Sequence, residues 1–109
     1  MAEFVKVSRV VDLPPGERLF HDFEYETVIV LNIAGRFYCI ANICSHDDGP
    51  LEDGKLDDFE ISCPRHGARF DVRNGRALCL PATKPIPQYA VKVEDGDIYV
   101  ESPDDKYIR

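Results

Sequence analysis

Apolar and polar positions alternate over short stretches along most of the chain, and turn residues separate these stretches. Residues 27–33 form the most apolar run, and Ala34-Gly35 separates it from a second run at 36–41. Two β-rich runs joined by a short glycine turn predict a β-hairpin. Further hairpins are expected around Asn74-Gly75 and Asp95-Gly96. The other predicted strands are residues 4–7, 18–23, 59–62, 69–72, 76–80, 88–93 and 98–100.

No stretch shows a sustained 3.6-residue period, so the pattern predicts an all-β sandwich or small barrel. A short helical turn is expected near residues 50–53. The proline-rich residues 81–87 are expected to be an extended connection, since proline lacks the N–H that a central strand needs. The polar residues 102–109 are expected to be a frayed tail. The length of 109 residues predicts one domain, 1–109.

Charge and hydropathy narrow the classes of partner. With 13 Lys+Arg against 20 Asp+Glu, the formal net charge is −7, which disfavours a nucleic-acid partner. The run at 27–33 is far shorter than the roughly 20 residues of a membrane helix. The first residues lack the basic and apolar regions of a signal peptide. We therefore expect a soluble cytoplasmic protein that binds neither membrane nor nucleic acid.

Two short motifs bring soft metal ligands together. Cys44-Ser45-His46 and Cys63-Pro64-Arg65-His66 each follow a predicted strand and open into a turn-rich loop. Tetrahedral zinc accepts two cysteines and two histidines, and so does a binuclear iron–sulfur cluster with both histidines on one iron. Zinc fingers usually place two cysteines before two histidines. Here each motif mixes one of each, which favours a cluster between two similar loops.

With their surroundings, these motifs resemble the small Rieske [2Fe–2S] ferredoxins, from about residue 4 to residue 101. The resemblance implies an antiparallel β-sandwich that holds one [2Fe–2S] cluster at one tip, between two loops. It implies that Cys44, His46, Cys63 and His66 are the cluster ligands. The other residues that carry the resemblance are Asp48-Gly49-Pro50-Leu51, Gly54, Gly67, Phe70-Asp71, Asn74-Gly75-Arg76-Ala77 and Pro81-Ala82.

The chain departs from the respiratory-chain Rieske proteins at four positions. Gly49 and Arg65 stand where those proteins have two further cysteines that form a disulfide. Ala68 and Phe70 stand where they have a serine and a tyrosine whose hydroxyls hydrogen-bond sulfur atoms at the cluster. Donors to sulfur stabilise the reduced cluster, so their loss lowers the midpoint potential. The chain therefore resembles the low-potential branch.

The resemblance implies a one-electron carrier with a flavin-dependent reductase as donor and an oxygenase or other redox protein as acceptor. We see no nucleophile or acid–base pair, so we expect no catalytic residues and no enzyme activity. One alternative is an auxiliary Rieske protein of iron–sulfur cluster assembly, which residues 47–51 also resemble. Another is a structural module similar to nitrite reductase small subunits, which the four ligand residues argue against. A zinc-binding interaction domain is the third.

Several residues near the motifs have simpler interpretations. Cys39 and Cys79 lie in predicted strands and are expected to be small buried apolar residues. His21 is expected to be a surface histidine, and Arg65 is expected to face solvent. Seven acidic residues against Lys55 lie between residues 47 and 60, and they form either a solvated face or a docking surface.

Overall fold

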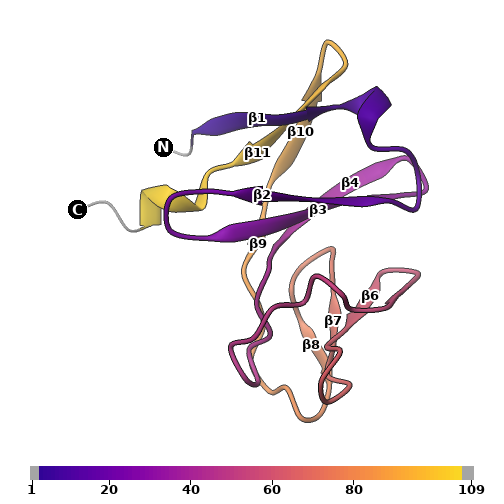
Figure 1. Cartoon of the computed structure of the whole chain (residues 1–109), viewed down its shortest axis with the longest axis vertical. Helices are drawn as coiled ribbons and strands as arrows, with labels where there is room; N and C mark the ends of the chain where they lie inside the picture. Colours follow the sequence, from indigo (N-terminus) through magenta and orange to yellow (C-terminus); the bar gives the residue numbers. More distant parts are fainter. Residues whose placement is uncertain (1–2, 107–109) are drawn as a thin grey trace.

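Short antiparallel strands are the main regular elements of the computed structural model, which describes residues 3–106 (Figure 1). Within that range no helix is both long and apolar enough to cross a bilayer. The elements are β1 (Phe4–Arg9), the 3₁₀ turn η1 (Val10–Asp12), β2 (Arg18–Asp22), β3 (Thr27–Ile33), β4 (Arg36–Ala41), β5 (Leu56–Asp57), β6 (Glu60–Ser62), β7 (Arg69–Asp71), β8 (Ala77–Cys79), β9 (Gln88–Tyr89), β10 (Val91–Glu94), β11 (Asp97–Glu101) and the 3₁₀ turn η2 (Pro103–Lys106).

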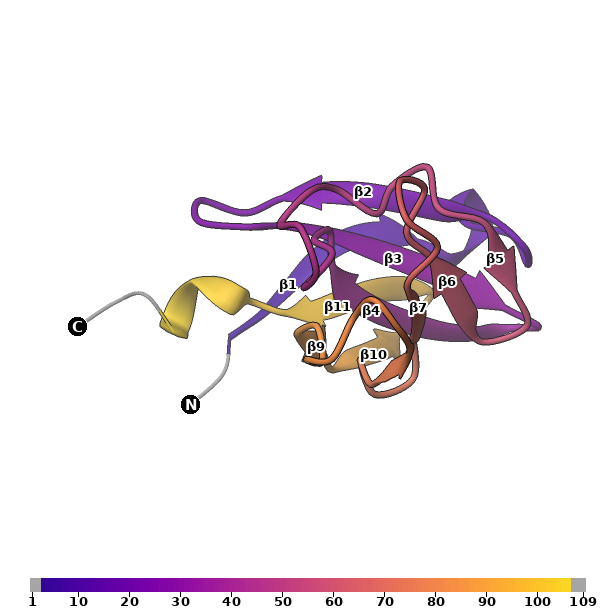
Figure 2. The ribbon, with the colours of Figure 1, turned by 90° about the horizontal axis from the view of Figure 1, so that it is seen from below.

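The strands form three antiparallel sheets, which confirms the all-β prediction. Sheet A has the order β1-β11-β10, sheet B the order β2-β3-β4-β9, and sheet C the order β5-β6-β7-β8. In Figure 1, sheets A and B form the upper part of the molecule, and β6, β7 and β8 of sheet C lie below them. Figure 2 looks onto the end with sheet C, whose strands and loops lie in front of the other two sheets.

Sheet B is covered on both faces, and this explains the continuous apolar run of β3. Val28 and Val30 pack into one core with Ile98 and other residues of sheet A. Ile29 and Leu31, which alternate with them, pack into a second core with residues around sheet C. Successive side chains of a strand point to opposite faces, so a strand between two cores needs apolar residues at both.

The second core lies beneath the loops that follow β4 and β6. It joins residues of sheets B and C with two residues of the proline-rich segment. Gly75, at φ 80°, holds that segment close: a Cβ there would lie 2.1 Å from the carbonyl oxygen of Ile86. The Ile86 N–H donates to the Gly75 carbonyl over 2.8 Å. The Asn74-Gly75 turn therefore fixes the second hairpin and the proline-rich segment together.

Two sequence expectations need correction, and one strand was not predicted. The predicted strand at 88–93 is two strands, because Gln88–Tyr89 pairs with β4 in sheet B and Val91–Glu94 pairs with β11 in sheet A. The helical turn expected near 50–53 is a hydrogen-bonded turn in which the Gly54 N–H donates to the Leu51 carbonyl over 2.8 Å. The short strand β5 was not predicted.

The C-terminal tail is more ordered than expected up to residue 106. It forms η2, and the Asp104 carboxylate accepts backbone N–H bonds from Glu24 (3.2 Å) and Tyr25 (3.1 Å). These bonds attach the tail to the β2–β3 turn. The prediction of a frayed tail is therefore wrong for residues 102–106. Residues 107–109, which that expectation also covers, lie outside the described residues.

Candidate metal centre

The first motif lies on a loop, residues 44–50, that follows β4 and closes on itself through backbone hydrogen bonds. The Cys44 N–H donates to the Gly49 carbonyl (2.7 Å), and the Asp48 N–H donates to the Cys44 carbonyl (2.8 Å). Asp48 adopts a left-handed backbone conformation, φ 59°, which aspartate tolerates better than most residues. We call residues 44–50 the first loop.

The second motif lies on an equivalent turn between β6 and β7, residues 63–68, which we call the second loop. The Cys63 N–H donates to the Ala68 carbonyl (2.6 Å), and the Gly67 N–H donates to the Cys63 carbonyl (3.0 Å). Gly67 is left-handed at φ 76°. The two loops therefore have the same hydrogen-bonded form, although histidine follows cysteine by two residues in the first and by three in the second.

All four residues that the sequence singled out come together between these loops. The Cys44 and Cys63 side chains are buried, and their Sγ atoms and an oxygen of Asp47 lie within 4.8 Å of one another. The rings of His46 and His66 are 5.2 Å apart between centroids, at an angle of 85°. Both histidines are exposed. The site thus has a sulfur side within the core and an imidazole side at the surface.

Burial raises the pKa of the Cys44 thiol, because the low-dielectric core disfavours the thiolate. Backbone N–H groups of His46 and Asp47 lower the same pKa to a smaller extent. A metal that binds here displaces the thiol proton and neutralises the buried charge.

Arg65 reaches across from the second loop to the first, which the sequence reasoning missed. Its Nε and Nη2 donate to the two oxygens of Asp47, with 2.9 Å between Nη2 and Oδ1. Its Nη1 donates to the Pro50 carbonyl over 2.9 Å. The hydrogen bonds from Arg65 hold the pKa of Asp47 well below its usual range. Arg65 is exposed, as expected, but its guanidinium is also bound to the first loop, which was not expected.

Gly49 leaves the room that the Arg65 side chain occupies. A Cβ at Gly49 would lie 2.6 Å from Arg65 Cζ. Gly49 and Arg65, which stand where the respiratory-chain Rieske proteins have two further cysteines, are thus neighbours in space. Among the described residues, all four cysteines are free of disulfides.

The remaining cysteines and the third histidine lie outside this cluster of ligands. Cys39 is fully buried in the core shared with sheet A, as expected. Cys79 is only half-buried, with its Sγ 3.6 Å from the Gly67 carbonyl oxygen, so the expectation of a buried apolar residue is wrong for it. A hydrogen bond from Arg69 lowers its pKa. His21 is half-buried and packs edge-on against Phe23.

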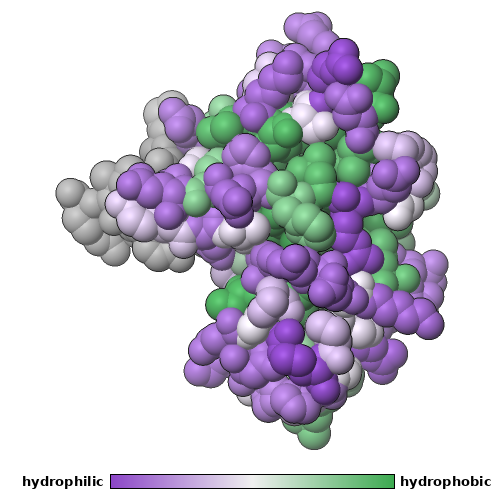
Figure 3. All heavy atoms as spheres, in the orientation of Figure 1, coloured by the Kyte–Doolittle hydropathy of each residue, from purple (hydrophilic) through white to green (hydrophobic). Residues whose placement is uncertain are grey.

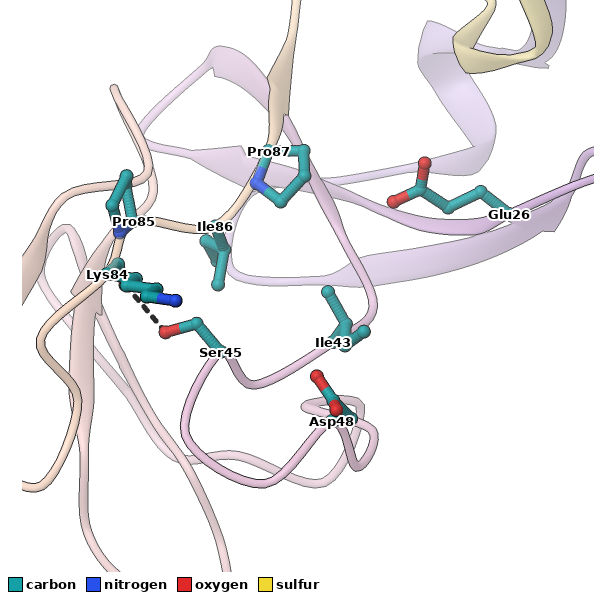
Figure 4. Close-up of a pocket in the computed structure, with 8 residues that line it drawn as sticks. All are labelled: Glu26, Ile43, Ser45, Asp48, Lys84, Pro85, Ile86 and Pro87. Atoms are coloured by element: carbon teal, nitrogen blue, oxygen red, sulfur yellow. Dashed lines mark hydrogen bonds between the residues drawn. The ribbon is translucent and has the colours of Figure 1, made fainter. Parts of the chain in front are cut away.

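A groove of about 440 Å³ lies beside the first loop (Figure 4). The Ser45 hydroxyl donates to the Lys84 carbonyl over 2.6 Å, which ties the first loop to the proline-rich segment at one side of the groove. The lining residues are Glu26, Ile43, Ser45, Asp48, Lys84, Pro85, Ile86 and Pro87.

The surface around the site is mostly polar. Figure 3 shows hydrophilic residues over most of the lower part of the molecule on the face drawn. Leu80 is an exception: this residue is 77% exposed, and it directly follows the cysteine that contacts the second loop. The sequence pattern gave no signal for this exposure, because Leu80 continues an apolar run.

Comparison with known proteins agrees with this geometry. The family model of the Rieske [2Fe–2S] domain matches residues 3–90. The ferredoxin subunit of 3-phenylpropionate/cinnamic acid dioxygenase from Escherichia coli K12 is 43% identical over 96 residues, which cover 87% of this chain and 90% of that protein.

Solved structures of dioxygenase ferredoxins share the fold. The ferredoxin of carbazole 1,9a-dioxygenase from Nocardioides aromaticivorans IC177 superposes with a TM-score of 0.84 at 35% identity, covering 90% of this chain and 96% of that one. A chain in a complex of reduced oxygenase and oxidised ferredoxin of carbazole 1,9a-dioxygenase also gives 0.84, at 30% identity, covering 90% and 92%.

The chain belongs to the Rieske [2Fe–2S] family, and within it the chain is a ferredoxin-type electron carrier. It binds one [2Fe–2S] cluster, which supplies one-electron oxidation and reduction. The residues present fit this group, because two buried thiols and two exposed imidazoles converge from two matching loops.

Proposed function

We propose that Cys44 and Cys63 bind one iron of the cluster, and that His46 and His66 bind the other. The separation of the site into a buried thiol side and an exposed imidazole side supports this assignment. A buried thiolate is stable only when a cation offsets its charge, whereas a neutral imidazole can bind iron at the surface. The remaining cysteines and histidine lie on strands outside both loops: Cys39 on β4, Cys79 on β8 and His21 on β2.

We infer that the chain takes single electrons from a flavin-dependent reductase and passes them to a terminal oxygenase. The observation that carries this proposal is the exposure of both His46 and His66 at one tip, where a partner can approach closely. The carbazole 1,9a-dioxygenase complex, in which a similar ferredoxin is joined to an oxygenase, supports an oxygenase as acceptor.

The same considerations support three further parts of the proposal. The chain acts as a carrier and not as an enzyme, and the reaction on an organic substrate takes place in the acceptor. Residues 1–109 act as one domain, because the core beneath the loops includes Ile29, Leu31 and Ile40 of sheet B. The cytoplasm is the proposed compartment, since Cys39 and Cys79 form no disulfide, which suits a reducing environment.

Single-turnover kinetics test this function. The cluster-loaded chain is reduced stoichiometrically and mixed with a ring-hydroxylating oxygenase that holds substrate and oxygen. We expect reoxidation of the chain at the rate at which hydroxylated product appears, and re-reduction when a flavin reductase and NADH are added. A chain that is reduced normally but never reoxidised by any oxygenase encoded beside it would overturn the oxygenase as acceptor and favour the cluster-assembly role.

A further inference from the structure

One side chain makes the hydrogen bonds between the two loops. Among the described residues, the hydrogen bonds that join residues 44–50 directly to residues 63–68 all come from the guanidinium of Arg65. Elsewhere the loops are attached separately, the first to the proline-rich segment through Ser45 and the second to sheet C. Arg65 therefore links the two loops by hydrogen bonds at the exposed end of the site.

The contacts of Arg65 use the full geometry of its side chain. Nε and Nη2 face both oxygens of Asp47, and Nη1 faces the Pro50 carbonyl, so three N–H groups fix the plane of the guanidinium. This set of three N–H donors, which we call the fork, fixes the orientation of the guanidinium and also attracts the carboxylate. An ammonium group attracts a carboxylate but does not fix an orientation in this way. The Arg65 and Asp47 side chains are 35% and 22% exposed, so water screens this pair less than a fully exposed one.

The remaining contacts place this pair at the edge of the site. Asp47 Oδ1 also accepts the Gly49 N–H over 3.0 Å, which fixes the carboxylate to its own turn. An oxygen of Asp47 lies within 4.8 Å of both thiol sulfurs, and Oδ2 lies 3.8 Å from His66 Nδ1. Without Arg65, the site would carry an unpaired carboxylate directly beside the proposed ligands.

We propose that Arg65 is a positioning residue: it clamps the first loop to the second through Asp47 and Pro50, retains the cluster and cancels the Asp47 charge. The inference rests on the ligand set proposed above. It assigns the clamp two separable effects. The fork holds the loops together, which slows loss of iron, and the positive charge offsets Asp47, which keeps the midpoint potential from falling.

Two substitutions break the clamp by different routes. Arg65→Gln removes the fork and the charge. Gly49→Ala keeps both residues of the pair but places a Cβ where the guanidinium lies, and the backbone of Gly49 is outside the left-handed region that would itself disfavour alanine. Arg9→Gln is the matched control, because it removes an exposed arginine–aspartate pair that lies within one short segment.

The test measures loss of visible absorption after addition of an iron chelator to the cluster-loaded protein. We expect loss roughly five- to tenfold faster in Arg65→Gln and in Gly49→Ala than in the wild type, and unchanged in Arg9→Gln. Wild-type rates in both clamp variants would overturn the proposal. The wild-type spectrum itself reports on the proposed ligand set, so a wild-type protein without a cluster would be a separate failure.

Potentiometry distinguishes the effect of the fork on iron retention from the effect of the Arg65 charge on the midpoint potential. Arg65→Gln should lower the midpoint potential, because it exposes the negative charge of Asp47 to the site. The double variant Asp47→Asn/Arg65→Gln should return the potential toward the wild-type value while it still loses iron quickly. Arg65→Lys should keep the potential and lose iron quickly. If the lysine variant retained iron as the wild type does, charge alone would explain the effect and the positioning role would be wrong.

Discussion

Asp48 and Gly67 occupy equivalent positions in the two loops. Each lies four residues after a cysteine, has a positive φ (59° and 76°), and donates its N–H to the carbonyl of that cysteine. The backbone therefore turns in the same way in both loops, whatever the spacing to the histidine. This repeated turn is the local device that directs the two cysteine side chains toward each other.

Substitution at Gly67 tests the need for this turn. Nothing lies within 4 Å of a Cβ at Gly67, so Gly67→Ala adds backbone strain and no steric contact. We expect a loss of about 1 to 2 kcal/mol in free energy of unfolding and faster loss of the cluster, while Asp48→Gly should be neutral or stabilising. Chemical denaturation and the visible spectrum measure both effects.

Gly16 supplies the control for that comparison. It is also left-handed, at φ 87°, with open space around a Cβ, but it lies in the β1–β2 connection. Gly16→Ala should cost similar stability and leave retention of the cluster unchanged. Equal cluster loss in both alanine variants would show that the turn in the second loop has no special role.

The midpoint potential should lie below about 0 mV, in the lower part of the Rieske range of about −150 to +300 mV. Ala68 and Phe70 are fully buried beside the second loop and offer no hydroxyl to sulfur. Ala68→Ser and Phe70→Tyr should each raise the potential, measured by protein-film voltammetry. A wild-type potential well above +100 mV would be inconsistent with this explanation.

Association with the acceptor should weaken as salt rises. The Debye length falls from about 10 Å at 0.1 M to about 3 Å at 1 M, so steering by charges near the tip is lost. Asp47 is paired with Arg65, which leaves the exposed Asp48, on the groove beside the first loop, as the carboxylate to test. Asp48→Asn keeps a residue that tolerates the left-handed backbone and should slow second-order electron transfer several-fold at low salt.

Asp95→Asn is the matched control, because Asp95 is also exposed and left-handed (φ 52°) but lies in the turn between β10 and β11. Figure 1 places that turn at the end of the molecule opposite sheet C. The rate of second-order electron transfer by Asp95→Asn should equal that of the wild type. Rates that do not change with salt, and that are the same in both variants, would exclude electrostatic docking at the tip.

The pair of Asp71 and Arg73 should stabilise the second hairpin at neutral pH. Asp71 is 7% exposed and accepts hydrogen bonds from the Arg73 backbone (2.9 Å) and guanidinium (3.0 and 2.9 Å). Asp71→Asn should lower the free energy of unfolding by about 1 to 3 kcal/mol, measured by denaturation. Glu94→Gln, which removes an exposed pair with Lys92, should change it by less than about 1 kcal/mol.

The difference in free energy of unfolding between the wild type and Asp71→Asn should be constant from about pH 5 to pH 8. The side-chain hydrogen bond from Arg73 holds the pKa of Asp71 below its ordinary value of 3.8. A carboxyl with a lowered pKa stabilises the folded state above the unfolded pKa and loses that effect only as pH falls below it. A difference that disappears between pH 8 and pH 5 would contradict this assignment.

The sequence predicted the elements whose signals are local. The hairpin of β3 and β4 follows the expected bounds, because the apolar run and its turn are adjacent in the chain. The break between β9 and β10 was missed, since alternation continues through residues 88–93 and only the neighbouring strands decide the sheet. The order in η2 was missed for a similar reason: its partners Glu24 and Tyr25 are about 80 residues away.

The same limit applies to the site. The motifs predicted which four residues converge, and the structure brings them together, while their role as ligands stays a prediction. The contact between Arg65 and Asp47 joins loops 18 residues apart and depends on the space above Gly49. No local pattern encodes that space, so the contact of Arg65 with the first loop was not predicted.

Pulsed electron paramagnetic resonance of the reduced protein, with ¹⁵N-labelled histidine, tests the central claim most directly. The account predicts uptake of one electron per chain and a paramagnetic centre coupled to two imidazole nitrogens, one of which disappears in His46→Ala and the other in His66→Ala if these variants keep a centre. Iron and acid-labile sulfide should be equal in amount. A centre without nitrogen coupling, or coupling that survives in both variants with an unchanged spectrum, would contradict the account.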